Sequence, residues 1–225
     1  MTHFPPLYPI LDAARFSSGP DPLAAMARFV EELLRGGATL IQYRNKSANG
    51  REMLSHAREL RRITSGRARL IVNDRTDICL AANCDGVHLG QDDLSPVAAR
   101  GILDSALPDA SGEKPSFWIG FSTHNLQQVA EAELLPVDYI AVGPVFSTGS
   151  KANPDPVIGL EGVRQARKVT SKPLVAIGGI TRENCRQVIE AGANSVAVIA
   201  DLVESPTTAT EQFLSVVFRV TRGKP

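Results

Sequence analysis

Hydrophobic runs alternate with amphipathic stretches from one end of this chain to the other. Eight short runs have the length and composition of β-strands: Leu7–Leu11, Leu40–Tyr43, Leu70–Asn73, Gly86–Leu89, Phe117–Phe121, Tyr139–Val142, Leu174–Ile177 and Ser195–Ile199. Several of them, such as LVAI and SVAVI, are almost wholly apolar, which is typical of parallel strands buried on both faces. The pattern therefore predicts a parallel sheet whose strands are separated by helices.

Helix signals fill the segments between these runs. Asp21, Ser95 and Ser205 each stand directly before a proline, which places a capping side chain ahead of a first helical position. Eight strand–helix units in 225 residues predict one (β/α)₈ (TIM) barrel domain over residues 1–225, close to the lower size limit of that fold. A doubly wound sheet is the rival, but the segment after the first strand, DAARFSSGP, lacks the G-x-G-x-x-G fingerprint.

The composition argues against some classes of partner. The chain has 24 basic and 24 acidic residues, a balance that does not fit a nucleic-acid-binding surface. No apolar run is long enough to span a membrane, and the first residues show no secretory signal, so we expect a cytoplasmic protein without a membrane partner. Cys79, Cys84 and Cys185 lack metal-type spacing and are expected to be buried and reduced. A homo-oligomer is compatible with the sequence.

Acidic residues follow two consecutive predicted strands. Asp74 comes directly after the strand that ends at Asn73, and Asp93 lies just beyond the strand that ends at Leu89. Because parallel neighbours end at the same edge of a sheet, the two carboxylates are expected to face each other. Such a pair suits Mg²⁺, which takes one or two protein carboxylates and completes its octahedron with water and phosphate oxygens. The alternative is that both aspartates cap the helices that follow.

Basic side chains follow the second predicted strand. Alternation along the chain places Gln42, Arg44 and Lys46 on one side, so that two cations and an amide point the same way. Arginine can bind a phosphate with two hydrogen bonds, while lysine supplies a mobile point charge. A solvated basic loop is the alternative.

Three further loops carry groups suited to anions. The loop GPVFSTGSK after the sixth strand is a candidate lid that contains Thr148, Ser150 and Lys151. Gly178–Gly179 and Ile199–Ala200 follow the seventh and eighth strands, where barrels of this kind commonly bind phosphate through backbone amides. A tight strand-to-helix turn also explains the glycine pair.

The fifth strand is followed by Ser122, Thr123 and His124. Helix capping by Ser122 or Thr123 accounts for most of this cluster, and His124 is expected on the surface of a first helical turn. Together, the polar strand ends predict a barrel that binds two phosphorylated small molecules, one a diphosphate with Mg²⁺ and the other a monophosphate.

The sequence resembles the thiamine-phosphate synthase family over nearly its whole length. The resemblance rests on LYPILD, IQYRNK, VNDRTDICLA, DGVHLGQDD, GFSTHN, DYIAVGPVFSTGSK, VAIGGI and GANSVAVIA, which occur in this order. It implies an enzyme that joins hydroxymethylpyrimidine diphosphate to thiazole phosphate, or to its carboxylated form. The products would be thiamine phosphate and pyrophosphate.

The resemblance also implies roles for single residues. Catalytic roles would fall to Arg44, Lys46, Lys151 and Ser122. The pyrimidine diphosphate would contact Gln42, Arg44, Lys46, Asn73, Ser122 and Lys151, with Mg²⁺ on Asp74 and Asp93. The thiazole phosphate would contact Thr148, Ser150, Gly179, Ile199 and Ala200.

Two positions bear on this resemblance. The family usually has serine where this chain has Ala200, so a hydroxyl contact is lost there while the backbone amide remains. Related thiazole tautomerases have a catalytic histidine where this chain has Pro144, which favours the synthase. The tautomerase and a non-catalytic thiamine-phosphate-binding protein are the alternatives.

Overall fold

Eight parallel strands close on themselves in the computed structural model of this chain, which describes residues 4–106, 116–148 and 155–222. The strands are β1 (Leu7–Asp12), β2 (Leu40–Arg44), β3 (Arg69–Asn73), β4 (Gly86–Leu89), β5 (Trp118–Thr123), β6 (Tyr139–Val142), β7 (Leu174–Ile177) and β8 (Ser195–Val198). Each strand pairs with its neighbours in chain order. The barrel closes where β1 pairs with β8, with Leu7 opposite Val196.

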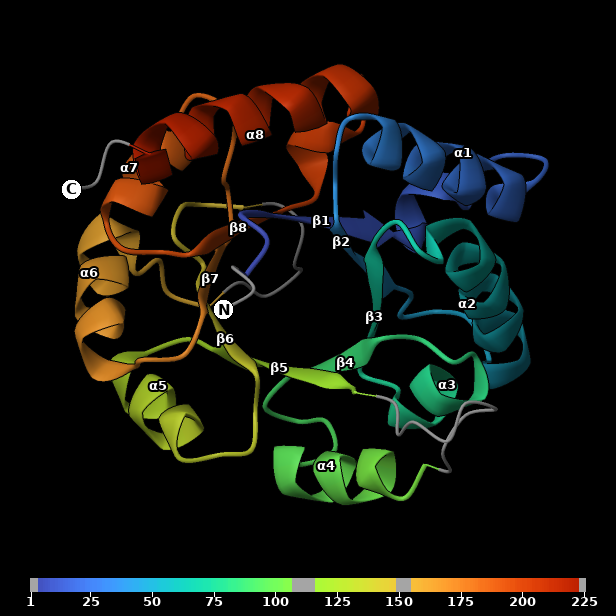
Figure 1. Cartoon of the computed structure of the whole chain (residues 1–225), viewed down its shortest axis with the longest axis horizontal. Coiled ribbons are helices and arrows are strands. Elements are labelled where there is room, and N and C mark those ends of the chain that lie inside the picture. Colours follow the sequence, from blue (N-terminus) through green and yellow to red (C-terminus); the bar gives the residue numbers. More distant parts are fainter. Residues whose placement is uncertain (1–3, 107–115, 149–154, 223–225) are drawn as a thin grey trace.

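Helices surround the strands. They are α1 (Pro22–Arg35), α2 (Gly50–Thr64), α3 (Thr76–Ala81), α4 (Pro96–Asp104), α5 (Leu126–Glu133), α6 (Gly159–Val169), α7 (Cys185–Glu190) and α8 (Pro206–Arg222), with short 3₁₀ helices η1 (Ala13–Phe16) and η2 (Ala200–Leu202). Figure 1 shows that the helices form a ring in chain order, with α8 lying beside α1. The side chains of Asp21 and Ser95 cap α1 and α4 as predicted.

The predicted TIM barrel is confirmed, and the strand boundaries differ by one or two residues. The strands β1, β2 and β3 each extend one residue beyond the predicted run. The predicted strand Phe117–Phe121 is shifted, because Trp118 is the first residue paired with β4 and Thr123 is still paired with Val142. The last strand ends before Ile199, since η2 begins at Ala200.

Apolar side chains fill the layer between strands and helices, which we call the outer shell. Its fully buried members include Leu33, Leu60, Val87 and Phe213. Burial of this apolar surface is the main favourable term in folding. The three cysteines also lie here, buried and free of disulfides, which agrees with the prediction.

The barrel interior holds a second cluster, formed by side chains that alternate inward along the strands. It contains Tyr8, Ile10, Leu40, Ile71, Tyr139, Ala141, Val175 and Ala197. The ring of Phe4 stacks on Trp118 with centroids 5.2 Å apart and lies 5.1 Å from Tyr139. Aromatic rings therefore close the amino-terminal end of the barrel. No helix within the described ranges has the length and apolar character needed to cross a membrane.

Candidate active site

A cavity of about 960 Å³ lies at the carboxyl-terminal ends of the strands. Its lining includes most of the residues predicted from sequence: Gln42, Arg44, Lys46, Asn73, Asp74, Asp93, Ser122, Thr148, Gly179, Ile199 and Ala200. Ser150 and Lys151 lie outside the described residues. The structure therefore brings the predicted strand-end groups, apart from these two, to one cavity.

The two predicted metal ligands lie together at the rim. Burial raises the pKa of the Asp74 carboxyl, the hydrogen bond from Lys46 lowers it, and the neighbouring Asp93 carboxyl raises it, with a raised pKa as the result. Asp74 also has a left-handed backbone with φ of 65°, a conformation that non-glycine residues seldom adopt outside functional or turn positions.

Helix capping does not explain these aspartates. The N-cap of α3 is Arg75, which makes no side-chain capping hydrogen bond, and the N-cap of α4 is Ser95. Asp93 instead accepts a hydrogen bond of 2.7 Å from the backbone N–H of Gly90 within its own loop. The capping alternative is therefore wrong, and the carboxylates are directed toward the cavity.

Both cations of the β2 end are paired with carboxylates. Lys46 Nζ lies 2.5 Å from Asp74 Oδ2, and Arg44 Nη1 lies 2.8 Å from Asp12 Oδ2. Sequence reasoning expected these cations to be free for a diphosphate and missed Asp12. The feature that could have identified Asp12 is its position at the end of the first strand, directly beside the end of β2.

A chain of hydrogen-bonded side chains crosses the barrel interior along the floor of the cavity. Gln42 Nε2 donates to Tyr8 Oη at 2.9 Å, and Tyr8 Oη lies 2.8 Å from Tyr139 Oη. Tyr139 Oη lies 3.0 Å from His88 Nδ1, and His88 Nε2 lies 2.9 Å from Ser122 Oγ. We call these five residues the interior chain. Two predicted substrate-binding residues, Gln42 and Ser122, are its ends.

His88 is the functional candidate that sequence reasoning missed most clearly. Burial lowers the pKa of its imidazole to about 4, so the ring is neutral near pH 7. It occupies an inward position of β4, in a run that otherwise reads as an ordinary apolar strand. A polar residue at an inward strand position was the available signal.

The residues after β5 differ from the expected capping arrangement. Asn125, not Ser122 or Thr123, is the N-cap of α5, and its side chain accepts from the backbone N–H of Gln128. Ser122 contacts His88, while Thr123 donates to the Ala141 carbonyl. His124 precedes the N-cap of α5 and lines the cavity half-buried, with its Nδ1 2.9 Å from the Gly143 carbonyl oxygen, so its predicted place in the first helical turn is wrong.

The loops after β6 and β7 fit tightly against each other. Gly178 and Gly179 have φ values of +101° and +62°. A Cβ at Gly178 would lie 2.5 Å from Pro144 Cβ, and one at Gly179 would lie 2.5 Å from the Ser147 carbonyl oxygen. Glycine is therefore needed here for both its backbone conformation and its small size.

Polar groups also line the cavity on the side of the last two strands. Arg182 Nε lies 3.0 Å from Asp201 Oδ2, and Arg182 Nη1 donates to Gln212 at 2.8 Å. Across the cavity, the Nδ2 group of Asn73 has no hydrogen-bond partner within the part of the chain that the structure describes. A buried amide donor without a protein partner is suited to a ligand.

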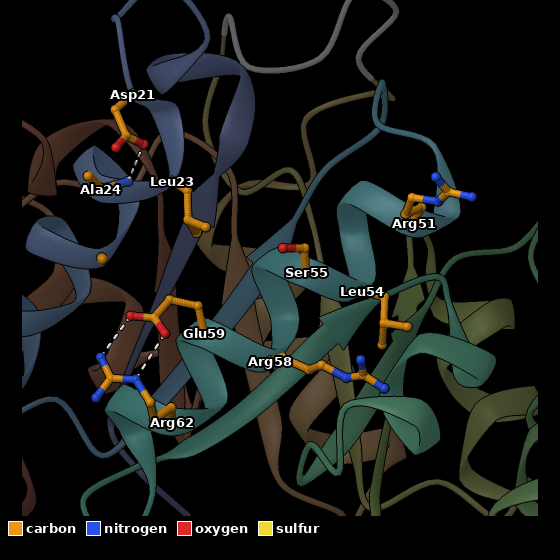
Figure 2. Close-up of a pocket in the computed structure, with 10 residues that line it drawn as sticks. Asp21, Leu23, Ala24, Arg51, Leu54, Ser55, Arg58, Glu59 and Arg62 are labelled. Atoms are coloured by element: carbon orange, nitrogen blue, oxygen red, sulfur yellow. Dashed lines mark hydrogen bonds and ion pairs between the residues drawn. The ribbon is translucent and has the colours of Figure 1, made fainter.

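A second cavity lies outside the barrel, between α1 and α2. It measures about 750 Å³, and Figure 2 shows Leu23 of α1 facing Ser55 and Glu59 of α2, with Asp21, the N-cap of α1, above them. The Arg62–Glu59 ion pair at its edge has an N–O distance of 2.7 Å. None of the predicted site residues lines it. The cavity at the strand ends is therefore the candidate active site.

The described residues hold no cluster of three or more His, Cys, Asp or Glu side chains that could bind a metal ion by themselves. The Asp74–Asp93 pair supplies two carboxylates. That number fits Mg²⁺, which keeps several waters and shares its coordination with substrate phosphates. It does not fit an all-protein site of the kind that holds structural zinc.

The closed barrel and the charged strand ends define a TIM-barrel enzyme that acts on small polar molecules. A model described as thiamine monophosphate synthase matches residues 7–202. The chain is 53% identical over 214 residues to a thiamine-phosphate synthase of Koribacter versatilis, covering 95% of this chain and 96% of that protein. It belongs to the thiamine monophosphate synthase family and is an enzyme of thiamine biosynthesis.

Other relatives agree. The chain is 40% identical over 197 residues to a thiamine-phosphate synthase of Chloroflexus aurantiacus, covering 87% of this chain and 86% of that protein. The solved thiamine phosphate pyrophosphorylase from Pyrococcus furiosus superposes with a TM-score of 0.79 at 36% identity, covering 96% of each chain. Both the sequence and the fold therefore place the chain in this family.

Proposed function

We propose that this enzyme joins 4-amino-2-methyl-5-hydroxymethylpyrimidine diphosphate to 4-methyl-5-(2-hydroxyethyl)thiazole phosphate, or to its carboxylated form. The products are thiamine phosphate and pyrophosphate. The observation that supports this most directly is the Asp74–Asp93 pair beside Lys46, facing the same cavity as Gln42 and Ser122. Such a rim suits a diphosphate next to a neutral heterocycle.

Asp74 and Asp93 would hold Mg²⁺. Their fit rests on charge: the Asp93 carboxylate disfavours ionisation of the half-buried Asp74 carboxyl, and a divalent cation relieves that repulsion. In the structure the Lys46 ammonium offsets the negative charge of Asp74, to which it donates a hydrogen bond. Movement of Lys46 onto the diphosphate would leave both carboxylates available. When bound, Mg²⁺ would neutralise charge on the departing pyrophosphate.

The reaction exchanges one bond for another at a single carbon. The C–O bond between the pyrimidine methylene and the diphosphate breaks, and its electron pair leaves with pyrophosphate. The amino group on the ring delocalises the cation that develops. The thiazole nitrogen then supplies the electron pair for the new C–N bond, so no side chain serves as nucleophile.

The protein contributes charge and position. Arg44, Lys46 and Lys151 would stabilise negative charge on the leaving group, a preorganised electrostatic effect. Gln42, Asn73 and Ser122 would orient the pyrimidine ring. On the other side, Thr148, Ser150, Gly179 and the Ile199–Ala200 turn would hold the thiazole phosphate, with Ala200 contributing its backbone amide only.

Pyrophosphate release tests this proposal. The purified enzyme is mixed with both substrates and Mg²⁺, and pyrophosphate is measured with and without the thiazole phosphate. We expect release that requires both substrates. Isomerisation of a thiazole without pyrophosphate release would identify the tautomerase instead. Calorimetric binding of thiamine phosphate without turnover would identify a non-catalytic binding protein.

Single substitutions test the assigned roles. We expect Asp93→Asn and Lys151→Ala each to lower kcat by about 10²–10³-fold while the fold is retained, since each removes charge stabilisation at the leaving group. Exposed residues on α4 and α6 provide matched controls, Asp104→Asn and Lys168→Ala, which should leave kcat unchanged. Near-normal turnover in both site variants would refute these roles.

A further inference from the structure

The interior chain connects two walls of the cavity through residues that do not themselves belong to the charged rim. Its members come from five strands: Gln42 from β2, Tyr8 from β1, Tyr139 from β6, His88 from β4 and Ser122 from β5. The three central residues are buried, at 1%, 0% and 8% exposure for Tyr8, Tyr139 and His88. Each of their hydroxyl and imidazole protons must therefore be used in a hydrogen bond within the interior chain.

The number of protons available gives the hydrogen bonds of the interior chain one direction of donation, from Gln42 to Ser122. Because the Gln42 amide donates to Tyr8, the single Tyr8 hydroxyl proton is free to go to Tyr139. The Tyr139 proton then goes to His88 Nδ1, which must accept it. His88 consequently carries its proton on Nε2 and donates to Ser122. Ser122 keeps its own hydroxyl proton for the cavity.

The same hydrogen bonds can also run in the opposite direction, but only if the donor and the acceptor exchange roles in every one of them. Gln42 would have to accept from Tyr8, and His88 would then carry its proton on Nδ1 and accept from Ser122. The two ends are therefore coupled. When Gln42 presents its carbonyl oxygen to the cavity, Ser122 presents a donor, and when Gln42 presents only N–H groups, Ser122 presents an acceptor.

We propose that His88 is a positioning residue that transmits this direction to Ser122, and that the interior chain thereby selects an aminopyrimidine over the corresponding oxopyrimidine. The Gln42 carbonyl would accept from the ring amino group, and the Ser122 hydroxyl would donate to an acceptor of the same ligand. An oxopyrimidine reverses this pattern, because an oxygen acceptor replaces the amino donor. A polar site rejects such a mismatch strongly. This inference rests on the proposed function.

The position of the His88 proton is the first test. Nitrogen NMR of ¹⁵N-histidine-labelled, unliganded enzyme distinguishes the two neutral tautomers, and the signal lost in His88→Gln identifies this ring. We expect the proton on Nε2. A proton on Nδ1 in the wild-type enzyme would overturn the proposed direction.

Reversal of the chain is the second test. Gln42→Glu, at pH 8, places an obligate acceptor beside Tyr8 and should move the His88 proton to Nδ1. Gln187→Glu makes the same change at an exposed position of α7 and should leave it on Nε2. If Gln42→Glu does not fold, Tyr139→Phe removes the central link and should give a mixture of tautomers. If a folded variant, either Gln42→Glu or Tyr139→Phe, keeps the His88 proton on Nε2 alone, the proposed coupling between Gln42 and His88 is wrong.

Substrate selection is the third test. The ratio of kcat/KM for the aminopyrimidine diphosphate to that for its oxo analogue should fall at least about tenfold in Tyr139→Phe, which breaks the coupling while Gln42 and Ser122 stay in place, and should be unchanged in Gln187→Glu. An unchanged ratio alongside a mixture of tautomers would overturn the selection. The tautomer is measured without substrate, so failure of the proposed function would appear separately, as absent pyrophosphate release from an enzyme whose His88 proton is on Nε2.

Discussion

The outer shell and the barrel interior are built from different kinds of interaction. In the outer shell, apolar side chains such as Leu33, Leu60 and Phe213 pack between strands and helices. The interior, of similar burial, contains a hydrogen-bonded chain that runs from Gln42 to Ser122. The outer shell needs apolar volume, while the interior needs each donor opposite an acceptor.

This difference separates stability from function. An apolar shell tolerates substitutions that conserve volume, because its contacts have little directionality. A buried polar network is sensitive to the loss of one member, since the remaining groups lose their partners in a medium of low dielectric constant. We therefore expect interior variants to change ligand binding as well as stability, and outer-shell variants to change stability alone.

Gly120→Ala should have the largest effect. A Cβ at this position of β5 would overlap the ring of Tyr139, so the ring must move and its bonds to Tyr8 and His88 must break. Overpacking together with unpaired buried groups should lower the unfolding free energy by about 3–6 kcal/mol. Urea unfolding measures this change. A loss below 1 kcal/mol with normal KM would show that Tyr139 can be displaced without consequence.

Leu60→Ala is the corresponding change in the outer shell. Leu60 on α2 is fully buried among apolar neighbours. Removing its side chain should lower the unfolding free energy by about 2–5 kcal/mol through lost burial and a residual cavity. The KM for the pyrimidine diphosphate should be unchanged in the folded protein. A raised KM would contradict the separation between the two regions.

His88 should make stability depend on pH. Burial lowers the pKa of His88 from 6.5 to about 4, so between these values the unfolded chain binds a proton that the folded protein does not. The unfolding free energy should therefore fall as pH decreases from 6.5 to 4, by about 3 kcal/mol from this residue, and should level off below.

Urea unfolding of the wild type and His88→Gln at pH 7 and pH 4 measures this contribution, which the variant should lack. His56→Gln is the outer-shell comparison. Burial also lowers the pKa of His56, but Glu52 opposes the shift, so its contribution should be smaller. Identical pH dependence in the wild type and His88→Gln would contradict the assignment.

Gly101→Ala should have the smallest effect and the opposite sign. Gly101 lies on the exposed face of α4, and a Cβ there would meet no atom within 4 Å. Alanine should stabilise the helix by about 0.5–1 kcal/mol. Thermal unfolding measures the change, and a loss of stability would indicate a contact at this surface that the isolated chain does not show.

The fold and much of the rim could be predicted because both depend on local patterns. Apolar runs locate the strands, and a polar residue directly after a strand must lie at the barrel mouth. That reasoning placed Asp74 and Asp93 at the cavity, and alternation along the second strand placed Gln42 there. It could not show that Lys46 is paired with Asp74, since that contact joins the ends of β2 and β3.

The interior chain was not predictable from local patterns. Tyr8, His88 and Tyr139 lie within strands, where tyrosine and histidine are consistent with ordinary packing. Their significance comes from strands β1, β4 and β6, which are far apart in sequence and meet only across the closed barrel. Sequence shows each residue, and only the closed geometry shows the hydrogen bonds between them.

The left-handed backbone of Asp74 has a consequence for how this protein would change under selection. Glycine adopts that conformation without steric penalty, so selection for thermal resistance alone would favour Asp74→Gly. The same replacement removes a rim carboxylate. A search for heat-resistant variants that ignores turnover should therefore drift toward an inactive enzyme at this position, and a screen that includes turnover should retain the strained aspartate.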